Sequence, residues 1–336
     1  MRYLKYLLAF VLPALAFLGF KWGNVFSYFT LLFAFGLIPY LEWKWKPVHS
    51  NVQAESIKTR MWFKLLLYLT LPIQIILLYY YFSAQLNPNV NAYTWIGNIS
   101  AMGIMCGVFG INVAHELGHS TKFFDRLVAR ILLSTSLYMH FYVEHNKGHH
   151  KWIGTVQDPA TARKNESLYA FWLRVIPGSY LSAWKISSNE CKRKNQSLIF
   201  NETFIYSIIQ LILCVGIFMW NPIALLSFLL VAILGAMLLE TVNYIEHYGL
   251  TRKKVNENRF EQVAPEHSWN SDHILGRAVL FELSRHSDHH ANPERPYQDL
   301  RSLDTSKQLP FGYPAMMVLA LFPTKWFQLM NPLLTD

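Results

Sequence analysis

Histidine is the residue type in this sequence whose number and spacing could support chemistry. Of the 13 histidines, nine fall in four short groups along the chain. These nine are His115, His119, His145, His149, His150, His247, His286, His289 and His290. Imidazole nitrogen binds Zn, Cu, Fe and Ni, and no C-x-x-C pair is present to offer thiolates instead. Nine ligands are too many for one ion, so we expect two metal ions that share them as four and five.

Helical periodicity explains how such short groups could aim their rings at common centres. Residues three or four apart lie on one face of a helix, which applies to the pairs His115/His119 and His145/His149. Adjacent residues diverge by about 100°. A doubled histidine such as His149 and His150 can therefore reach two different ions.

Carboxylates beside these histidines are candidates for partners that orient the rings. Glu116, Glu144, Glu246 and Asp288 each lie next to one of the nine histidines in the sequence. A metal-bound histidine commonly donates its other N–H to such a group, which selects the tautomer. The alternative for each carboxylate is a solvated or ion-paired surface charge.

Glu240 is a further candidate because it lies within an apolar stretch, seven residues before His247. A carboxylate in such a place is costly and is by default a functional candidate. Its alternative is a neutral buried carboxyl that hydrogen-bonds to a neighbouring helix. For the histidines outside the four groups we expect structural roles; these are His49, His140, His267 and His273.

The elements that must position these residues are membrane-spanning helices. The chain of 336 residues is 52% hydrophobic and only 15% charged, whereas a soluble protein carries about 25% charged residues. Apolar stretches of spanning length, roughly 17 to 25 residues, cover about 4–20, 25–41, 61–82, 93–114, 203–220 and 223–245. A seventh apolar run, about 127–143, is interrupted by Arg130, and we expect a helix there at the interface or packed against the bundle.

Basic residues predict which side of the membrane carries the histidines. With both termini in the cytoplasm, Lys21 is the only one of the 30 Lys and Arg that falls in an outside loop. The segments at about 115–202 and 246–336 are then cytoplasmic, and the net charge of +9 belongs to that face. It could meet anionic lipids, an acidic protein partner, or both. We therefore expect one all-α integral membrane domain over 1–336, with six transmembrane helices and a cytoplasmic histidine-rich cap. Cys106, Cys191 and Cys214 are expected to stay reduced.

At the histidine groups, the sequence resembles the alkane 1-monooxygenase family of membrane non-haem di-iron enzymes, within the fatty-acid desaturase and hydroxylase superfamily. The resemblance runs from about Leu37 to Pro323. It rests on the motifs HELGHS (115–120), FYVEHNKGHH (141–150), DPATAR (158–163), NYIEHYGL (243–250), SRHSDHHANPERPYQDL (284–300) and LPFGYP (309–314). The histidine boxes alone indicate the superfamily, whereas NYIEHYG with RHSDHH is specific to the alkane and xylene branch.

This resemblance implies that the nine histidines bind two iron ions and that O2 is a co-substrate. The implied reaction is hydroxylation of an alkane to a 1-alkanol. The implied location is a bacterial inner membrane, where the protein would contact membrane lipids. No nucleic-acid partner is implied. Electrons would come from rubredoxin and its NADH-linked reductase. The sequence contains no rubredoxin-like C-x-x-C pair, so we expect the donor to be a separate protein. Ser120 and the stretch at 42–47 depart from the sequence pattern of the family. Neither departure involves a metal ligand, so both bear on the range of substrates and on the docking of a partner protein.

Other functions remain open at this point. A membrane zinc protease would use His115-Glu116-x-x-His119, but it leaves about six clustered histidines without a role. A desaturase or hydroxylase of acyl lipids or alkyl aromatics would share the metal site. A metal transporter would need ligands along a path across the membrane, whereas the histidines here are expected on one side of it. Ala34 and Gly36 on the second span could leave room for a long chain, or could serve close helix packing.

Overall fold

The computed structural model describes residues 2–51, 57–257 and 259–334. Within them, six helices are long and apolar enough to cross a membrane, which confirms the number expected from hydropathy. They cover Tyr3–Trp22, Asn24–Lys44, Arg60–Gln85, Ala92–Gly118, Glu202–Trp220 and Pro222–His247. The observed ends extend past the apolar stretches because polar residues continue or cap the helices. Asn91, for example, accepts a hydrogen bond from Thr94 N at 2.8 Å.

Several spans combine segments of different helical type. The first joins η1 (Arg2–Phe10) to α1 (Val11–Trp22). The second joins η2 (Asn24–Tyr28), α2 (Phe29–Leu32), η3 (Phe33–Leu37) and α3 (Ile38–Lys44). The fourth joins α5 (Ala92–Met105), η4 (Cys106–Asn112) and α6 (Val113–Gly118). The third is α4 (Ile57–Gln85), the fifth α11 (Glu202–Trp220) and the sixth α12 (Pro222–His247). Both η3 and η4 are π-helical, a geometry often found at functional sites.

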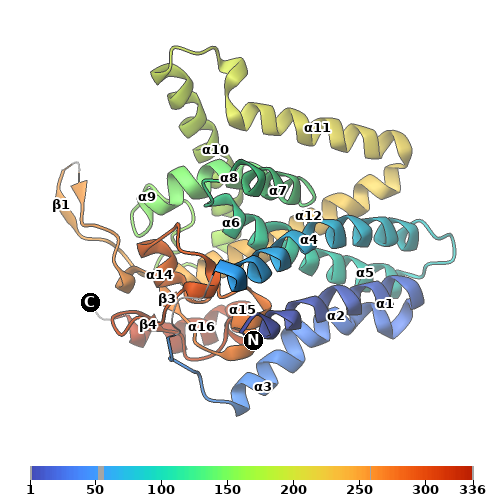
Figure 1. Cartoon of the computed structure of the whole chain (residues 1–336), viewed down its shortest axis with the longest axis horizontal. Helices are drawn as coiled ribbons and strands as arrows, with labels where there is room; N and C mark the ends of the chain where they lie inside the picture. Colours follow the sequence, from blue (N-terminus) through green and yellow to red (C-terminus); the bar gives the residue numbers. More distant parts are fainter. Residues whose placement is uncertain (1, 52–56, 258, 335–336) are drawn as a thin grey trace.

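The fourth span is the centre of the bundle. In its most apolar window 78% of the residues are buried, against 11% for α11. α12 packs against α5 and η4, and α1 packs against α4 and α5. In Figure 1, α11 runs along one flank of the molecule, joined to it by α12 and α10 (Leu168–Arg193). The segment that leads into the first histidine group is therefore held from several sides.

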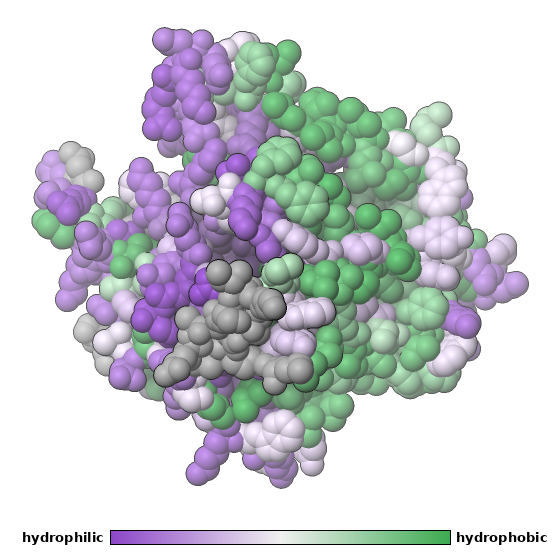
Figure 2. All heavy atoms as spheres, viewed as in Figure 1, coloured by the Kyte–Doolittle hydropathy of each residue, from purple (hydrophilic) through white to green (hydrophobic). Residues whose placement is uncertain are grey.

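The cap is built from the two long segments that follow the fourth and sixth spans. The first contributes α7 (Phe123–Ser134), α8 (Phe141–Glu144), η5 (His145–His149), α9 (His150–Trp152), α10 and η6 (Leu198–Phe200). The second contributes η7 (Pro265–His267), α13 (Ile274–Val279), α14 (His286–Ala291), η8 (Tyr297–Asp299), α15 (Tyr313–Ala320), α16 (Pro323–Met330) and η9 (Asn331–Leu333). Figure 2 shows hydrophilic side chains gathered over this end of the molecule and hydrophobic ones over the spans.

The expected all-α fold class is confirmed. Within the described residues, the cap adds four strands of two or three residues. β1 (Lys254–Asn256) pairs antiparallel with β2 (Arg259–Phe260), and β3 (Trp269–Asn270) pairs parallel with β4 (Lys307–Gln308). The apolar run at 127–143 is not one helix. α7 ends at Ser134, because Leu137 adopts a positive φ of 50° and Tyr138 N bonds back to Leu133 O at 3.0 Å. α7 packs against α6 and α4, as the bundle-packed alternative predicted.

A buried ionic network ties the cap to the first span. Glu282 accepts hydrogen bonds from Arg277 at 2.7 Å, Tyr6 at 2.9 Å and Lys5 at 2.5 Å. Nearby, Arg285 donates to Asp272 at 3.0 Å and to the Leu300 carbonyl at 2.8 Å. Arg285 immediately precedes α14, so this network holds the chain at the start of the last histidine group.

Candidate metal centre

The nine histidines come from four segments that meet where the spans join the cap. The fourth span supplies His115 and His119 at the end of α6, and the sixth supplies His247 at the end of α12. The other six lie on the η5–α9 segment and on α14. Together they form two compact groups in which the nitrogens of each group lie within 4.8 Å of one another.

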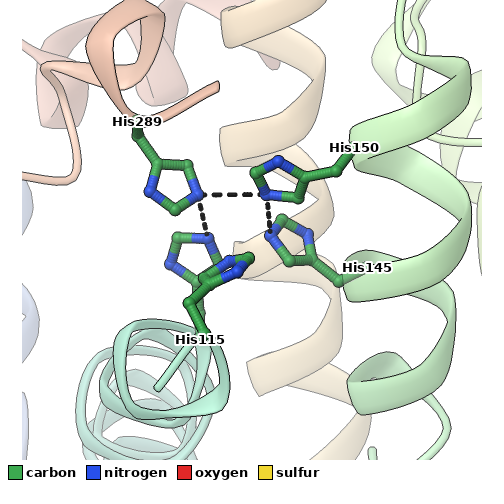
Figure 3. A group of neighbouring side chains, drawn as sticks. His115, His145, His150 and His289 are labelled. Carbon is green, nitrogen blue, oxygen red and sulfur yellow. Dashed lines mark hydrogen bonds between the residues drawn. The ribbon is translucent and has the colours of Figure 1, made fainter. Parts of the chain in front are cut away.

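The first group, here called the five-histidine group, consists of His115, His119, His145, His150 and His289. The Nε2 atoms of His115 and His289 are 3.0 Å apart, and those of His289 and His150 are 3.1 Å apart. His150 and His145 approach to 2.9 Å. Figure 3 shows these rings pointing at one another from three separate segments of the chain.

The second group, the four-histidine group, consists of His149, His247, His286 and His290. His286 Nε2 lies 3.1 Å from His247 Nε2 and 2.8 Å from His290 Nε2. Adjacent histidines are divided between the groups, since His149 and His290 belong here whereas His150 and His289 belong to the five-histidine group. This division agrees with the angular step between neighbouring helical residues. The expectation that His145 and His149 share one face is wrong, because they belong to different groups. The segment His145–His149 is π-helical, and His145 shares its group with His150 instead.

The two groups have the properties of metal sites. The Nε2 atoms of His119 and His149 are buried and have no hydrogen-bond partner among the described residues. Converging lone pairs at about 3 Å are costly to bury unless a cation lies between them. Each set of nitrogens therefore fits one metal ion, and imidazole without thiolate suits iron, copper or zinc.

The electrostatics favour neutral, ligating imidazoles. Burial, followed by the neighbouring imidazoles, lowers the pKa of His119 to about 4. The same causes hold the pKa of five others well below the usual value, namely His145, His150, His286, His289 and His290. Because metal binding requires the deprotonated nitrogen, these six rings are prepared to bind near pH 7.

The carboxylate that orients the His149 ring, Asp158, is not among those selected from the sequence. Asp158 Oδ2 lies 3.0 Å from His149 Nδ1 and also accepts a hydrogen bond from Thr161 at 2.6 Å. Asp158 begins the DPATAR stretch, nine residues after His149, so adjacency to a histidine could not reveal it. A second ring is oriented by backbone, since His247 Nδ1 lies 3.4 Å from the His267 carbonyl oxygen.

Of the five carboxylates selected from the sequence, Glu246 is the one with a contact to the histidine groups among the described residues. Its Oε2 atom lies 3.2 Å from His286 Nε2. The other four have different partners. Glu116 accepts from Tyr297 N, Glu144 from Ser182, Glu240 from Tyr138 and Asn243, and Asp288 from Arg295 and Arg301. The contacts of Glu240 are those of its alternative role, a carboxyl bonded within the helix bundle.

The four remaining histidines lie outside both groups. His140 is buried against Tyr138 and Tyr180, and His49 contacts Asp272 at 3.0 Å. The ring of His267 contacts Glu261, and His273 contacts the Ser271 hydroxyl at 2.9 Å. The three cysteines carry no disulfide.

An apolar cavity, here called the outer cavity, lies between the spans and the cap. Its walls come from α1, η3, α3, α5, η4, α12, α13 and α15, and include Leu12, Ile38, Ile104, Leu239 and Met317. A smaller inner cavity is lined by Asn112, His115, Glu116, Phe281, Leu283, His289 and Leu300. Ala34 lines the outer cavity, whereas a Cβ built at Gly36 would meet nothing within 4 Å, so Gly36 serves neither cavity nor close packing.

A polar pocket opens beside His119 on the cap. Its walls include the basic side chains Arg60, Lys64, Lys122 and Arg295 together with Ser120. The pocket also carries the acidic side chains Glu116, Asp125 and Glu294, so charges of both signs lie close to the five-histidine group.

Comparison with known proteins agrees with this geometry. The sequence profile of the family described as "Fatty acid desaturase" matches residues 90–320, which contain all nine histidines. The chain is 37% identical to alkane 1-monooxygenase of Ectopseudomonas oleovorans over 94% of this chain and 80% of that protein. It is 37% identical to alkane 1-monooxygenase 1 of Alcanivorax borkumensis over 89% and 75%. The hydroxylase component of the xylene/toluene monooxygenase of Pseudomonas putida is 27% identical over 71% and 64%.

Proposed function

This chain belongs to the alkane 1-monooxygenase family, within the fatty acid desaturase superfamily, and from this premise we propose that it hydroxylates the terminal methyl group of alkanes. An alkane, O2, two electrons and two protons would give a 1-alkanol and water. The observation that carries the proposal is the position of the outer cavity, an apolar space that shares Asn112 and Leu283 with the inner cavity, which is bounded by His115 and His289.

The nine histidines would hold two iron ions, five at one and four at the other. When bound, iron supplies the redox chemistry with O2 that cleaves an unactivated C–H bond, which zinc, having no redox chemistry, does not supply. The chain's own residues provide neutral imidazoles, and Asp158 holds His149 in one tautomer and orientation. The apolar walls of the outer cavity bind the hydrocarbon and keep water from it.

Electrons would reach the site from a separate, small acidic protein of the rubredoxin class, itself reduced by an NADH-linked reductase. The distribution of basic residues supports this, because 22 of the 30 Lys and Arg lie in the two segments that form the cap and carry the nine histidines. Complementary charge raises the association rate of such partners. By the distribution of basic residues, this face would lie in the cytoplasm of a bacterial cell, with the spans in its inner membrane.

A second candidate function is oxidation of an acyl lipid or an alkyl aromatic compound. It is favoured by the match to the desaturase profile and by the xylene/toluene relative, whose metal site would be shared. A zinc protease fits less well, because His115 and His119 belong to a group of five histidines rather than to a single zinc site. A metal transporter also fits less well, because His115 and His247 lie at the ends of α6 and α12 and both belong to the two compact groups.

The deciding experiment uses the purified full chain with rubredoxin, reductase, NADH and O2. We expect two irons per chain and the 1-alkanol from octane or hexadecane. Parallel reactions with an acyl lipid and with xylene separate the second candidate. Zinc in place of iron, or products from the acyl or aromatic substrate only, would contradict alkane hydroxylation.

A further inference from the structure

The outer and inner cavities meet at two side chains. Asn112 and Leu283 are the residues that line both cavities among the described residues. Beyond them, the inner cavity is bounded by His115 and His289 of the five-histidine group. We call Asn112 and Leu283 the neck.

The space beyond the neck is small. The inner cavity has a volume of about 10 Å3, which holds about one water-sized group. A methyl group is of comparable size, whereas a methylene within a chain brings two carbon neighbours with it. The end of a hydrocarbon can therefore enter this space, but the middle of one would have to bend double to do so.

The neck is held rigidly. Asn112 ends the π-helical η4, is buried, and donates from Nδ2 to the Leu280 carbonyl at 3.1 Å. After Leu280, both Phe281 and Glu282 adopt positive φ angles of 51° and 60°, which bulky and charged residues adopt only when their surroundings hold them there. Those surroundings are the hydrogen bonds that Glu282 accepts from the first span and from α13.

We propose that this neck makes Asn112 and Leu283 the residues that restrict oxidation to the chain end. They admit the terminal methyl to the side of His115 and His289 and stop the second carbon. Asn112 is the only polar side chain that lines the outer cavity in the described part of the chain. Its amide is tied to Leu280, so its role here is that of a fixed wall. This inference rests on the proposed function, because it concerns where an alkane is oxidised.

The first test measures the ratio of 2-octanol to 1-octanol formed from octane. Asn112→Ala and, separately, Leu283→Ala widen the neck and should each raise this ratio roughly tenfold, the lower end of what one methylene is worth in an apolar pocket. Ile104→Ala is the matched control, since Ile104 lines only the outer cavity. It should alter chain-length preference and leave the ratio as in the unmodified chain. A ratio that stays constant in both neck variants, or that rises equally in the control, overturns the proposal.

A second test needs neither turnover nor iron and therefore separates this inference from the proposed function. The unmodified full chain is photolabelled with an octane analogue that carries a diazirine at its terminal carbon, and with one that carries it at mid-chain. The terminal probe should label peptides containing Asn112, His115 or Leu283, and the mid-chain probe those containing Leu239 or Met317. Identical labelling by the two probes would contradict the neck. If labelling is as expected but no alkane is oxidised, the proposed function fails while the arrangement of the cavities stands.

Discussion

At the scale of single residues, each ring in the two histidine groups has a defined neighbour. Losing one imidazole leaves the remaining ones of its group facing an incomplete coordination shell. Replacing any one of the nine histidines with alanine should therefore abolish hydroxylation and lower bound iron, measured by metal analysis of the purified chain. His273→Ala is the matched control, because His273 lies outside both groups and contacts Ser271. Full iron content and activity in His247→Ala would remove that residue from the ligand set.

Replacing Asp158 tests whether the orientation of the His149 ring matters for iron binding, separately from the presence of the ring. Asp158→Asn keeps the shape but can present an N–H to His149 Nδ1, which disfavours the tautomer that ligates through Nε2. Such changes typically cost about 10- to 100-fold in metal affinity or activity. We expect a loss of that size in iron affinity, measured by competition with a chelator. The exposed residue Asp304 provides the control substitution Asp304→Asn; equal affinities in the two variants would assign Asp158 no part in the site.

At the scale of elements, α14 depends on a buried ion pair rather than on its own length. It has six residues, too few for a stable isolated helix, and Arg285 before it is held by Asp272 at 3.0 Å. Removing one partner of a buried ion pair costs up to about 3–5 kcal/mol, and here Glu282, 3.7 Å from Arg285, would compensate part of the charge left behind. Asp272→Ala should thus lower the thermal unfolding midpoint in detergent and reduce bound iron. Glu257→Ala, at an exposed position, should do neither; an unchanged midpoint in Asp272→Ala would show that α14 is held by other contacts.

At the scale of the whole molecule, the hydrophilic cap and the apolar spans are separated along one axis (Figure 2). Positive-inside topology predicts that the cap is cytoplasmic. A reporter fused after Asp336 should be active in the cytoplasm, and one inserted near Asn89, between α4 and α5, should be active outside. A cytoplasmic reporter at Asn89 would reverse the membrane orientation and the placement of the metal centre.

Electron delivery depends on how the donor protein docks on the cap. Of the 30 Lys and Arg, 22 lie in the two segments that form the cap and carry the nine histidines. If an acidic donor docks there, the donor concentration for half-saturation should rise steeply between low and moderate ionic strength, because salt screens the attraction. Turnover at saturating donor should change little. A half-saturation that does not vary with salt would leave the positive charge explained by membrane insertion alone.

The sequence by itself determined the spans and the divergence of adjacent histidines, but not which rings share an ion, since His145 and His149 belong to different groups. Spans follow from uninterrupted apolar length, and the split of His149 from His150 follows from the angular step of a helix, so both are local properties. The tertiary structure alone decided that Asp158 contacts His149, that Glu246 is the selected carboxylate beside a ring, and that α7 ends at Ser134. It also decided that Asn112 and Leu283 lie together and form the neck, since they are 171 positions apart in the sequence. Contacts of this kind depend on how separate helices pack, and no periodicity within either segment encodes the other.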